Sequence, residues 1–348
     1  MLGAIQGNGV HRVRVLQMLL SRGFRGAERH VADLANAQAA RHEVLLLLRA
    51  DAADAAGITI RDWLAPEVRV ALLRRPFWWL RAALIERRFR PDILHAHGGR
   101  ASRLAARLPG TAPRLATMHL DYRPGWYRGL AALVAPTRWQ AAAARAGGFS
   151  GDVEEIALWH EAAPAPPPAA IAAVRAELGA GPDSVVIGAV GTLIRRKGFD
   201  LLIEAFRAAA PAHAVLAIAG EGEERAALRA LAGDDPRIRL LGFRRDIATL
   251  YGAFDLFVSP AREEPFGLVF LEAMAAGCPI LATATEGARE VVQHGLLPVE
   301  DRAALQAALA GTVREPRRSY DLSAWSKSRA LDRLDLLYAG LLAIQGRR

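Results

Sequence analysis

Short runs of branched and leucine-rich residues recur along the chain, separated by stretches in which apolar positions follow helical spacing. This alternation is typical of parallel sheets covered by helices on both faces. The first half predicts strands at residues 13–20, 44–48, 68–72, 93–95, 115–118 and 133–135. The second half predicts strands at residues 185–190, 214–219, 238–241, 256–259 and 279–282. The pattern therefore predicts an α/β protein with two doubly wound sheets in series.

A proline-rich stretch, residues 162–168, separates the two series of strands. Proline favours extended backbone and cannot continue a helix, so this stretch is the expected linker between domains at 1–165 and 166–323. The terminal segment, 324–348, predicts one or two helices that pack back toward the first domain. Two such domains in series create a cleft between the carboxyl ends of their sheets, where sheets of this kind bind ligands.

Composition narrows the class of protein. The 348 residues are 52% hydrophobic and 23% charged, with 31 Gly and 19 Pro, which excludes disordered and collagen-like chains. The apolar runs are all shorter than the ~18 residues that cross a bilayer, and the first, 15–20, is too short for a signal peptide. A single cysteine, Cys278, permits no internal disulfide and no cysteine cluster for a metal. We therefore expect a protein of a reducing compartment, the cytoplasm.

The net charge of +9 predicts attraction to an anionic partner, which leaves nucleic acid, a lipid surface and a phosphorylated substrate open. The two lysines, Lys197 and Lys327, leave 43 arginines among the 45 basic residues, and with the many alanines this excess indicates codon bias. A retained lysine is therefore informative. A nucleic-acid-binding protein stays an alternative, although the sequence contains no recognised basic helix, zinc module or aromatic RNA motif. We expect no nucleic-acid partner.

The segment 259–280 carries the most informative chemistry. A predicted strand ends near residue 259, a loop carries Glu264, and Phe266, Gly267 and Leu268 open a helix that is expected to end at residue 277. Such a helix mouth offers free N–H groups to a phosphate or diphosphate. Glu272, one turn deeper, can accept two hydrogen bonds from a vicinal diol such as a ribose. The alternative is an exposed loop acid and a solvated helix acid, which the apolar neighbours of Glu272 disfavour.

The spacing of Glu264 and Glu272 resembles the E-x7-E signature of glycosyltransferase family 4, and the resemblance extends over nearly the whole chain. It implies the GT-B fold of two Rossmann-like domains, with an acceptor domain followed by a nucleotide-sugar domain. It also implies retaining, metal-independent transfer of a sugar from a nucleotide donor, so we expect no cofactor and no metal. Glu264 and Glu272 would be the two acids of this signature, and Glu264, from its place in the loop, would meet the sugar joined to the far end of the diphosphate.

The loop 188–198 is similar to the G-R-x…K-G loop of this family, in which Lys197 would bind the donor diphosphate. Thr192 stands where the family has an arginine, so Arg195 or Arg196 is the expected replacement. By position alone, a solvated surface lysine is the alternative for Lys197. Further along the chain, Gly222, Phe243 and Arg244 lie in segments that look like the strand ends lining the nucleobase pocket, the last two acting mainly through their backbone.

Segments of the first half also resemble the family. The loop 21–30 is similar to the G-G-A-E loop, so Arg25 and Gly26, with residues 23 and 24, would face the donor phosphate; a plain βα turn is the alternative. His119 resembles the histidine beside the transferred sugar, and a structural histidine at a strand end is the alternative. His95 and His97 are expected to shape the floor of the cleft.

We therefore expect a hexosyltransferase that moves a sugar, from UDP in the favoured case, to an acceptor hydroxyl on an envelope glycolipid or polysaccharide precursor. The resemblance implies that Lys197, a nearby arginine and helix-terminal amides stabilise the leaving diphosphate. The sequence offers no obvious side-chain nucleophile, which favours attack by the acceptor on the face that the nucleotide leaves. A sugar-nucleotide epimerase or hydrolase of the same fold is the alternative enzyme.

Residues 74–90 contain six arginines beside Phe77, Trp78 and Trp79. Basic side chains among such aromatic rings suit a peripheral contact with the anionic inner leaflet of a membrane. The alternative is a helix whose tryptophans enter the core while its arginines are solvated.

Overall fold

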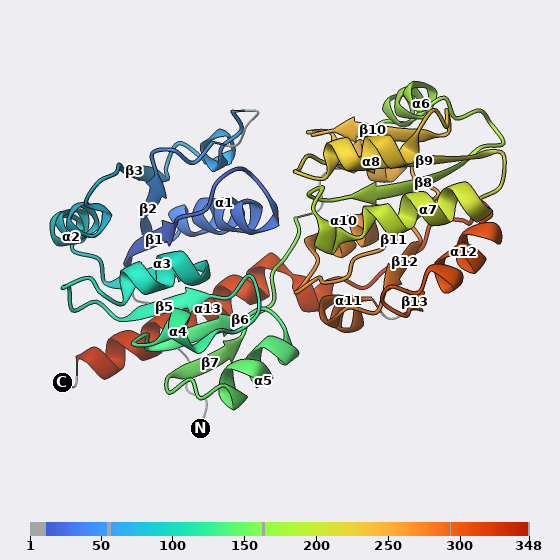
Figure 1. The fold of residues 1–348 in the computed structure, drawn as a ribbon. Coiled ribbons are helices and arrows are strands. Elements are labelled where there is room, and N and C mark those ends of the chain that lie inside the picture. The colour runs from blue at the N-terminus through green and yellow to red at the C-terminus, as the bar shows by residue number, and fades with distance from the viewer. Residues whose placement is uncertain (1–11, 54–56, 162–163, 293, 347–348) are drawn as a thin grey trace. The chain divides into compact units, whose positions relative to one another are not determined.

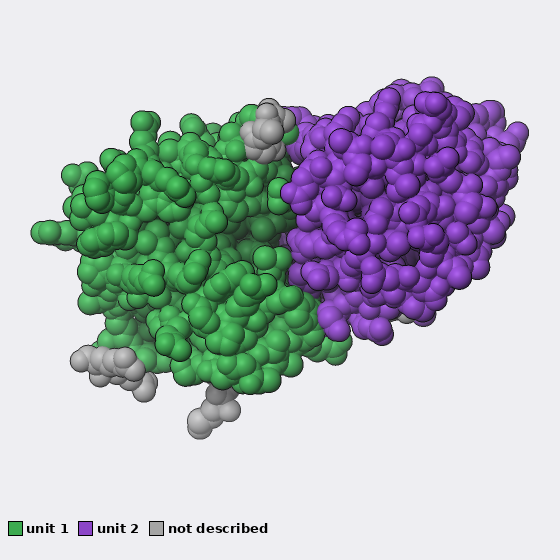
Figure 2. Space-filling view, in the orientation of Figure 1, with its two compact units in different colours: residues 1–156, 330–348 green, residues 157–329 purple. Residues whose placement is uncertain are grey.

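The computed structural model describes residues 12–53, 57–161, 164–292 and 294–346. Two compact units divide the chain (Figure 2). Unit 1 contains Met1–Ile156 and Ala330–Arg348, and unit 2 contains Ala157–Arg329. The first two residues of the proline-rich stretch, 162 and 163, lie outside the described residues, and α6 begins at the end of this stretch.

Unit 1 is a parallel sheet with helices on both faces (Figure 1). Its strand order is β3-β2-β1-β4-β5-β6-β7. The strands are β1 (Arg14–Leu19), β2 (Glu43–Arg49), β3 (Arg69–Leu73), β4 (Ile93–His97), β5 (Arg114–Thr117), β6 (Ala132–Ala135) and β7 (Asp152–Glu155). The helices are α1 (Gly26–Ala39), η1 (Ile60–Trp63), α2 (Trp78–Phe89), α3 (Gly98–Ala105), α4 (Pro124–Tyr127), α5 (Arg138–Ala146) and, from Ala330 on, α13 (Lys327–Gln345).

Alternate side chains of the strands in unit 1 fill two apolar cores. Leu16 and Met18 of β1 pack with α2, α3 and α5, whereas Leu19, with alternate residues of β2, packs with α1 and η1. Strands buried on both faces require near-continuous apolar runs, which is why the sequence pattern located them. The terminal segment that the sequence predicts as helical forms η3 and α13, and in α13 Leu331, Leu334 and Leu341 are buried.

Unit 2 repeats this architecture with the strand order β10-β9-β8-β11-β12-β13. The strands are β8 (Val185–Val190), β9 (Ala214–Ala219), β10 (Ile238–Gly242), β11 (Leu256–Ser259), β12 (Ile280–Thr283) and β13 (Leu296–Leu297). The helices are α6 (Pro168–Glu177), η2 (Arg195–Lys197), α7 (Phe199–Ala209), α8 (Arg225–Ala232), α9 (Ile247–Ala253), α10 (Leu268–Ala275), α11 (Glu286–Val291), α12 (Arg302–Ala310) and η3 (Ser323–Trp325). Helices α7, α8 and α12 pack on one apolar core, and α6, α9, α10 and α11 on the other.

Both sheets confirm the predicted doubly wound α/β fold. In each, the first strand pairs with the second on one side and with the fourth on the other, so the chain order reverses beside β1 and beside β8. Ligands of such sheets bind at the carboxyl ends of the strands that flank this switch point. In unit 2 those strands are β8 and β11.

The chain's single thiol lies within the apolar core of unit 2. Cys278 is fully buried, and its Sγ donates to the carbonyl oxygen of Phe254 at 3.6 Å. Burial raises the pKa of the Cys278 thiol to about 12. The thiol is therefore protonated at neutral pH and withdrawn from chemistry. No helix among the described residues is long and apolar enough to cross a membrane.

Candidate functional site

The loop that follows β8 is folded against the loop that follows β11. The N–H groups of Arg262 and Glu263 donate to the carbonyl oxygen of Arg196 at 2.8 and 3.2 Å. Gly198, which precedes α7, has φ of +69°, and a Cβ there would lie 2.0 Å from the carbonyl oxygen of Pro260. Only glycine permits this backbone conformation together with so close an approach. The two loops are therefore a single unit of structure at the switch point.

Lys197 and Glu264 meet where these loops touch. The Lys197 Nζ donates to Glu264 Oε2, and the two side chains are 15% and 9% exposed. A buried charge needs such a partner, because an unpaired ion inside a protein is costly. The alternatives of a solvated surface lysine and an exposed loop acid are therefore wrong. Sequence reasoning gave the two residues separate partners on a ligand and did not anticipate that they pair with each other.

The other candidate side chains of the β8 loop are less enclosed. Thr192 is half-buried and its carbonyl oxygen accepts the N–H of Ile194 at 2.8 Å. Arg195 is exposed and Arg196 is partly exposed. Both arginines therefore have freedom to turn toward an anion, whereas Lys197 is held in place.

The loop carrying Glu264 is anchored by glycines. The Glu264 carbonyl oxygen accepts the N–H of Gly287 at 2.8 Å, and a Cβ at Gly287 would come within 2.5 Å of that oxygen. Gly267, with φ of +88°, caps α10, which begins at Leu268, and Phe266 before it is buried. The helix ends at Ala275 rather than at the predicted residue 277, because Gly277 adopts φ of +67°. The predicted helix mouth is therefore present next to Glu264.

Glu272 lies one turn into α10, as predicted, and is half-buried. The hydroxyl of Tyr251 on α9 lies 3.2 Å from Glu272 Oε2 and 3.2 Å from the carbonyl oxygen of Val269. Burial, and then the nearby Glu272 charge, raises the pKa of Tyr251 well above its usual value, so this hydroxyl keeps its proton and donates. The carboxylate of Glu272 is thereby fixed in orientation. Tyr251 was not found from the sequence, because nothing local marks it as a partner of α10.

The segment after β9 closes against the same β8 loop. A Cβ at Gly222 would lie 2.2 Å from the carbonyl oxygen of Leu193, whose N–H donates to the carbonyl oxygen of Glu221 at 2.9 Å. Phe243 is partly exposed. The Arg244 guanidinium forms one ion pair with Asp246 at 2.7 Å and another with Glu177 at the end of α6. The side chain of Arg244 is thus held in ion pairs within unit 2. Its backbone is the part that the sequence analysis expected to line the nucleobase pocket.

Arg262 is a second residue of the unit 2 site, besides Tyr251, that sequence reasoning missed. Its guanidinium forms two hydrogen bonds of 2.8 Å with Asp200 at the start of α7, pairs with Glu300 at 2.7 Å, and donates to the carbonyl oxygen of Arg195 at 2.8 Å. A paired arginine at this point fixes the β11 loop to the β8 loop. The only sequence feature that could have pointed to Arg262 is its position between Ser259 and Glu264.

In unit 1, the loop after β1 turns into α1 as expected. Arg25 and Gly26 are exposed at the start of the helix, and the Arg25 N–H donates to the Glu28 side chain at 3.0 Å. Glu28 is buried, and this desolvation raises the pKa of its carboxyl. Phe24 stacks on Trp63 with ring centroids 3.7 Å apart. Arg25 and Gly26 thus lie at the β1 side of the switch point of unit 1.

Histidines gather at the carboxyl ends of β4 and β5. His119, which follows β5, lies with Nε2 3.4 Å from Nδ1 of His97, and its ring centroid is 5.6 Å from that of His30 on α1. Burial lowers the pKa of His119 to about 4, so the imidazole is neutral at pH 7. His30 was not singled out from the sequence, because its helix gives no sign that this face meets the strand ends.

His95 was expected to shape the floor of a cleft, but it lies in the interior of unit 1. Its side chain is fully buried, with Nδ1 2.8 Å from the hydroxyl of Tyr338 and Nε2 2.8 Å from Thr117 Oγ1. Burial lowers the pKa of His95 to about 3. Tyr338 belongs to α13 and also accepts a hydrogen bond from Gln38 at 3.1 Å. His95 therefore holds α13 in unit 1 and does not line an open surface.

Within the described ranges, no group of three or more His, Cys, Asp or Glu side chains is arranged to hold a metal ion. The positive charge beside the start of α10 comes from Lys197 and the arginines of the β8 loop. The chemistry that this arrangement supports is recognition of an anionic group joined to hydroxyl-bearing groups.

Two family descriptions match the chain. Residues 184–315 match "Glycosyl transferases group 1" and residues 24–152 match "Glycosyltransferase Family 4". These ranges include the unit 2 site and the unit 1 histidines, respectively.

Relatives and solved structures agree with these matches. The chain is similar to the lipopolysaccharide core biosynthesis glycosyltransferase LpsD of Rhizobium meliloti, with 32% identity over 266 residues and 74% of each chain covered. It is 31% identical to LpsE of the same organism over 219 residues, covering 62% of each chain. The fold resembles Anabaena HepE in complex with UDP-glucose, with a TM-score of 0.75, 22% identity and coverage of 97% of this chain and 99% of that one. By these similarities, the chain belongs to glycosyltransferase family 4 and has the GT-B fold.

Proposed function

We propose that the protein is a retaining, metal-independent glycosyltransferase that moves a sugar from a UDP-sugar to a hydroxyl of an envelope glycolipid or polysaccharide precursor. The observation that carries the proposal is the ion pair of Lys197 and Glu264 at the switch point of unit 2, followed in the chain by Glu272, which lies one turn into α10. A cation, a helix mouth and two carboxylates in this order match the diphosphate, sugar and ribose of a nucleotide sugar.

Lys197 and Glu264 exchange partners when the donor binds. In the structure each neutralises the other. A diphosphate at the mouth of α10 competes with Glu264 for the Lys197 ammonium, and the released carboxylate then accepts hydrogen bonds from the sugar hydroxyls. Lys197 stabilises the charge that grows on the leaving diphosphate, and exposed Arg195 or Arg196 adds a second cation.

Glu272 serves the ribose. Its carboxylate is held by Tyr251, and a carboxylate offers about four lone-pair positions, so it can also accept bonds from a diol. Because the ribose is bound in ground and transition states alike, this contact supports nucleotide affinity rather than turnover. Gly222, Phe243 and the backbone of Arg244 are the proposed edge of the nucleobase site.

The transfer step needs no protein nucleophile. The acceptor hydroxyl oxygen forms a bond to the anomeric carbon on the face from which the phosphate oxygen departs, and the acceptor proton passes to that oxygen. His119 is neutral, as burial dictates, and offers a hydrogen bond to the transferred sugar without adding charge. Arg25 and Gly26 are proposed to approach the donor phosphate from unit 1.

The choice of UDP rests on likeness to a protein that was crystallised with UDP-glucose, and the choice of acceptor on the relatives named for lipopolysaccharide core biosynthesis. A lipid-borne acceptor and a buried lone cysteine suit work in the cytoplasm, at the inner face of the membrane.

The test is a panel of nucleotide sugars measured by thermal shift, followed by assay of the stabilising donor with lipopolysaccharide core acceptors. A ligand at 100 times its Kd adds about 2.7 kcal/mol of stability. We expect stabilisation by a UDP-sugar, product with the donor's anomeric configuration by NMR, and undiminished turnover in EDTA. Inverted product, or activity lost in EDTA and restored by manganese, would contradict the mechanism. Release of free sugar or an isomer without acceptor would instead identify a hydrolase or an epimerase.

A further inference from the structure

Helix α2 has an apolar stripe on its outer face. The side of the helix that meets the sheet carries Ala82 and Phe89, which are buried in the unit 1 core. On the other side, Leu80 and Leu84 lie one turn apart and are 45% and 46% exposed. Just before and at the start of the helix, Phe77 is 66% exposed and Trp79 is 57% exposed. Four large apolar side chains at one exposed helix exceed the scattered apolar residues of an ordinary surface.

The charges around this stripe have one sign. The arginines of residues 74–90 are all exposed, and they are Arg74, Arg75, Arg81, Arg87, Arg88 and Arg90. The only acid in that range, Glu86, is buried, where it accepts the Gly110 N–H at 3.2 Å and lies 3.6 Å from Arg114. The carbonyl end of the helix dipole favours Arg87 and Arg88, but the dipole disfavours positive charge at the beginning of α2. Helix stability therefore does not account for the arginines that precede and open the helix.

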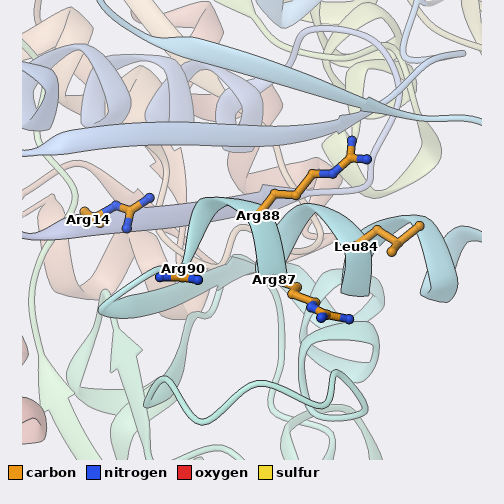
Figure 3. Close-up of a pocket in the computed structure, with 5 residues that line it drawn as sticks. All are labelled: Arg14, Leu84, Arg87, Arg88 and Arg90. Carbon is orange, nitrogen blue, oxygen red and sulfur yellow. The ribbon is translucent and has the colours of Figure 1, made fainter.

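Four arginines of unit 1, with Leu84, line a cavity of about 610 Å³. Figure 3 shows Leu84, Arg87 and Arg88 projecting from α2, with Arg90 just beyond its end and Arg14 on β1. Arg14 has Glu43 3.4 Å away, and no acidic side chain is among the residues that line the cavity. Arginines gathered at one place attract an anion, and their planar guanidinium donors fit phosphate oxygens.

The tryptophans divide between core and surface. Trp78 packs against the unit 1 core, with the guanidinium groups of Arg49 and Arg75 over its ring at 5.1 and 5.3 Å. Trp79 and Phe77 instead face outward. The expectation of tryptophans buried in the core is therefore right for Trp78 and wrong for Trp79.

We propose that this region is a docking surface for a bilayer of anionic phospholipid. The surface, called here the α2 surface, consists of Phe77, Trp79, Leu80, Leu84 and the exposed arginines of residues 74–90. The cavity takes a lipid phosphodiester head group, while the aromatic and leucine side chains enter the boundary with the acyl chains. A nucleic acid would use the arginines but has no counterpart for the two exposed leucines. The surface brings the enzyme to a lipid-borne acceptor, yet its binding is measurable without any transfer.

The test is co-sedimentation of the full chain with vesicles of phosphatidylcholine alone and of phosphatidylcholine with 30 mol% phosphatidylglycerol, at low and high salt. The variant changes Arg87, Arg88 and Arg90 together to glutamine. The matched control changes Arg128, Arg229 and Arg329, which are also exposed, to glutamine, so that net charge falls equally. We expect the wild type and the control to bind anionic vesicles at low salt. The α2 variant should lose about 100-fold in partitioning, since each arginine at such a surface contributes about fivefold.

A second variant separates charge from insertion. Leu80→Ser with Leu84→Ser keeps every arginine and should weaken binding by at least about tenfold, because two apolar side chains no longer leave water. The emission of the wild type should shift to the blue on anionic vesicles, and Trp79→Phe should remove most of that shift. Equal binding by the arginine variant and its control, or binding to short RNA at the same salt with none to vesicles, would overturn the proposal. UDP-induced thermal stabilisation, measured on the same variants, reports separately on the proposed function.

Discussion

Unit 1 and unit 2 have the same strand order around their first strand, yet the side chains at the two switch points differ in kind. In unit 2 the loops after β8 and β11 bring together a lysine and a carboxylate, and a second carboxylate follows in α10. In unit 1 the ends of β4 and β5 carry histidines that burial keeps neutral. One backbone plan therefore supports a charged edge in unit 2 and, at the ends of β4 and β5, an uncharged polar edge in unit 1.

The largest effect should come from the charged edge. Lys197→Ala should lower kcat at least ~10²-fold, because one electrostatic stabiliser of the leaving group is lost. Lys327→Ala is the matched control, since it removes the other lysine, whose Nζ pairs with Glu161 at 2.9 Å on the exposed surface. Steady-state assays of both variants check the prediction. Nearly normal turnover in Lys197→Ala would transfer the role to Arg195 or Arg196.

The rigidity of the charged edge can be tested with two glycines. Gly198→Ala should lower the free energy of unfolding by about 3 kcal/mol, because left-handed strain adds to a clash with the Pro260 carbonyl. Gly148 in unit 1 has φ of +78° with no other atom near its Cβ position, so Gly148→Ala should cost only about 1 kcal/mol. Urea unfolding compares the two variants. Equal losses would mean that the β8 loop moves away from Pro260 at little cost.

The neutral edge should make unit 1 sensitive to acid. An unfolded histidine titrates near 6.5, whereas burial lowers the pKa of His119 to about 4, so the unfolded chain binds more protons between these values. Stability should therefore fall as pH falls through this window, by about 2 kcal/mol from His119 alone between pH 7.5 and pH 5. His119→Asn should reduce this loss in urea unfolding at the two pH values. An unchanged pH dependence would show that folding does not lower the pKa of His119.

The smallest effect concerns nucleotide affinity. Glu272→Gln should raise the Kd for free UDP about tenfold, because hydrogen bonds to an ionised carboxylate become bonds to a neutral amide. Tyr251→Phe keeps the carboxylate and should change the Kd by about threefold at most, since only its orientation is affected. Isothermal titration calorimetry measures both. An unchanged Kd in Glu272→Gln would remove Glu272 from the ribose site.

All eleven predicted strands occur within two residues of the expected bounds. They were predictable because a strand that is buried on both faces is a continuous apolar run in the sequence. Strand β7 was missed because Asp152–Glu155 contains three acids, as an edge strand can. Strand β13 was missed because it has two residues. In both cases pairing with a neighbouring strand, rather than local pattern, defines the element.

Contacts between distant loops were not predictable from the sequence. Glu264 and Glu272 are marked by their spacing, but the Lys197–Glu264 pair joins residues 67 positions apart. The same holds for Tyr338, whose hydroxyl reaches His95 across 243 positions. Such pairs depend on how loops and terminal helices pack, which residue spacing does not record.

The buried thiol of Cys278 has a practical consequence for studying the chain in solution. Because it is the only cysteine and burial holds its pKa near 12, maleimides and other thiol-directed labels should leave the folded protein unmodified. A substitution such as Leu84→Cys then introduces a single reactive handle without first removing a native one. The molecule is thus already suited to site-directed spin or fluorophore labelling, by which the environment of any chosen exposed position can be followed.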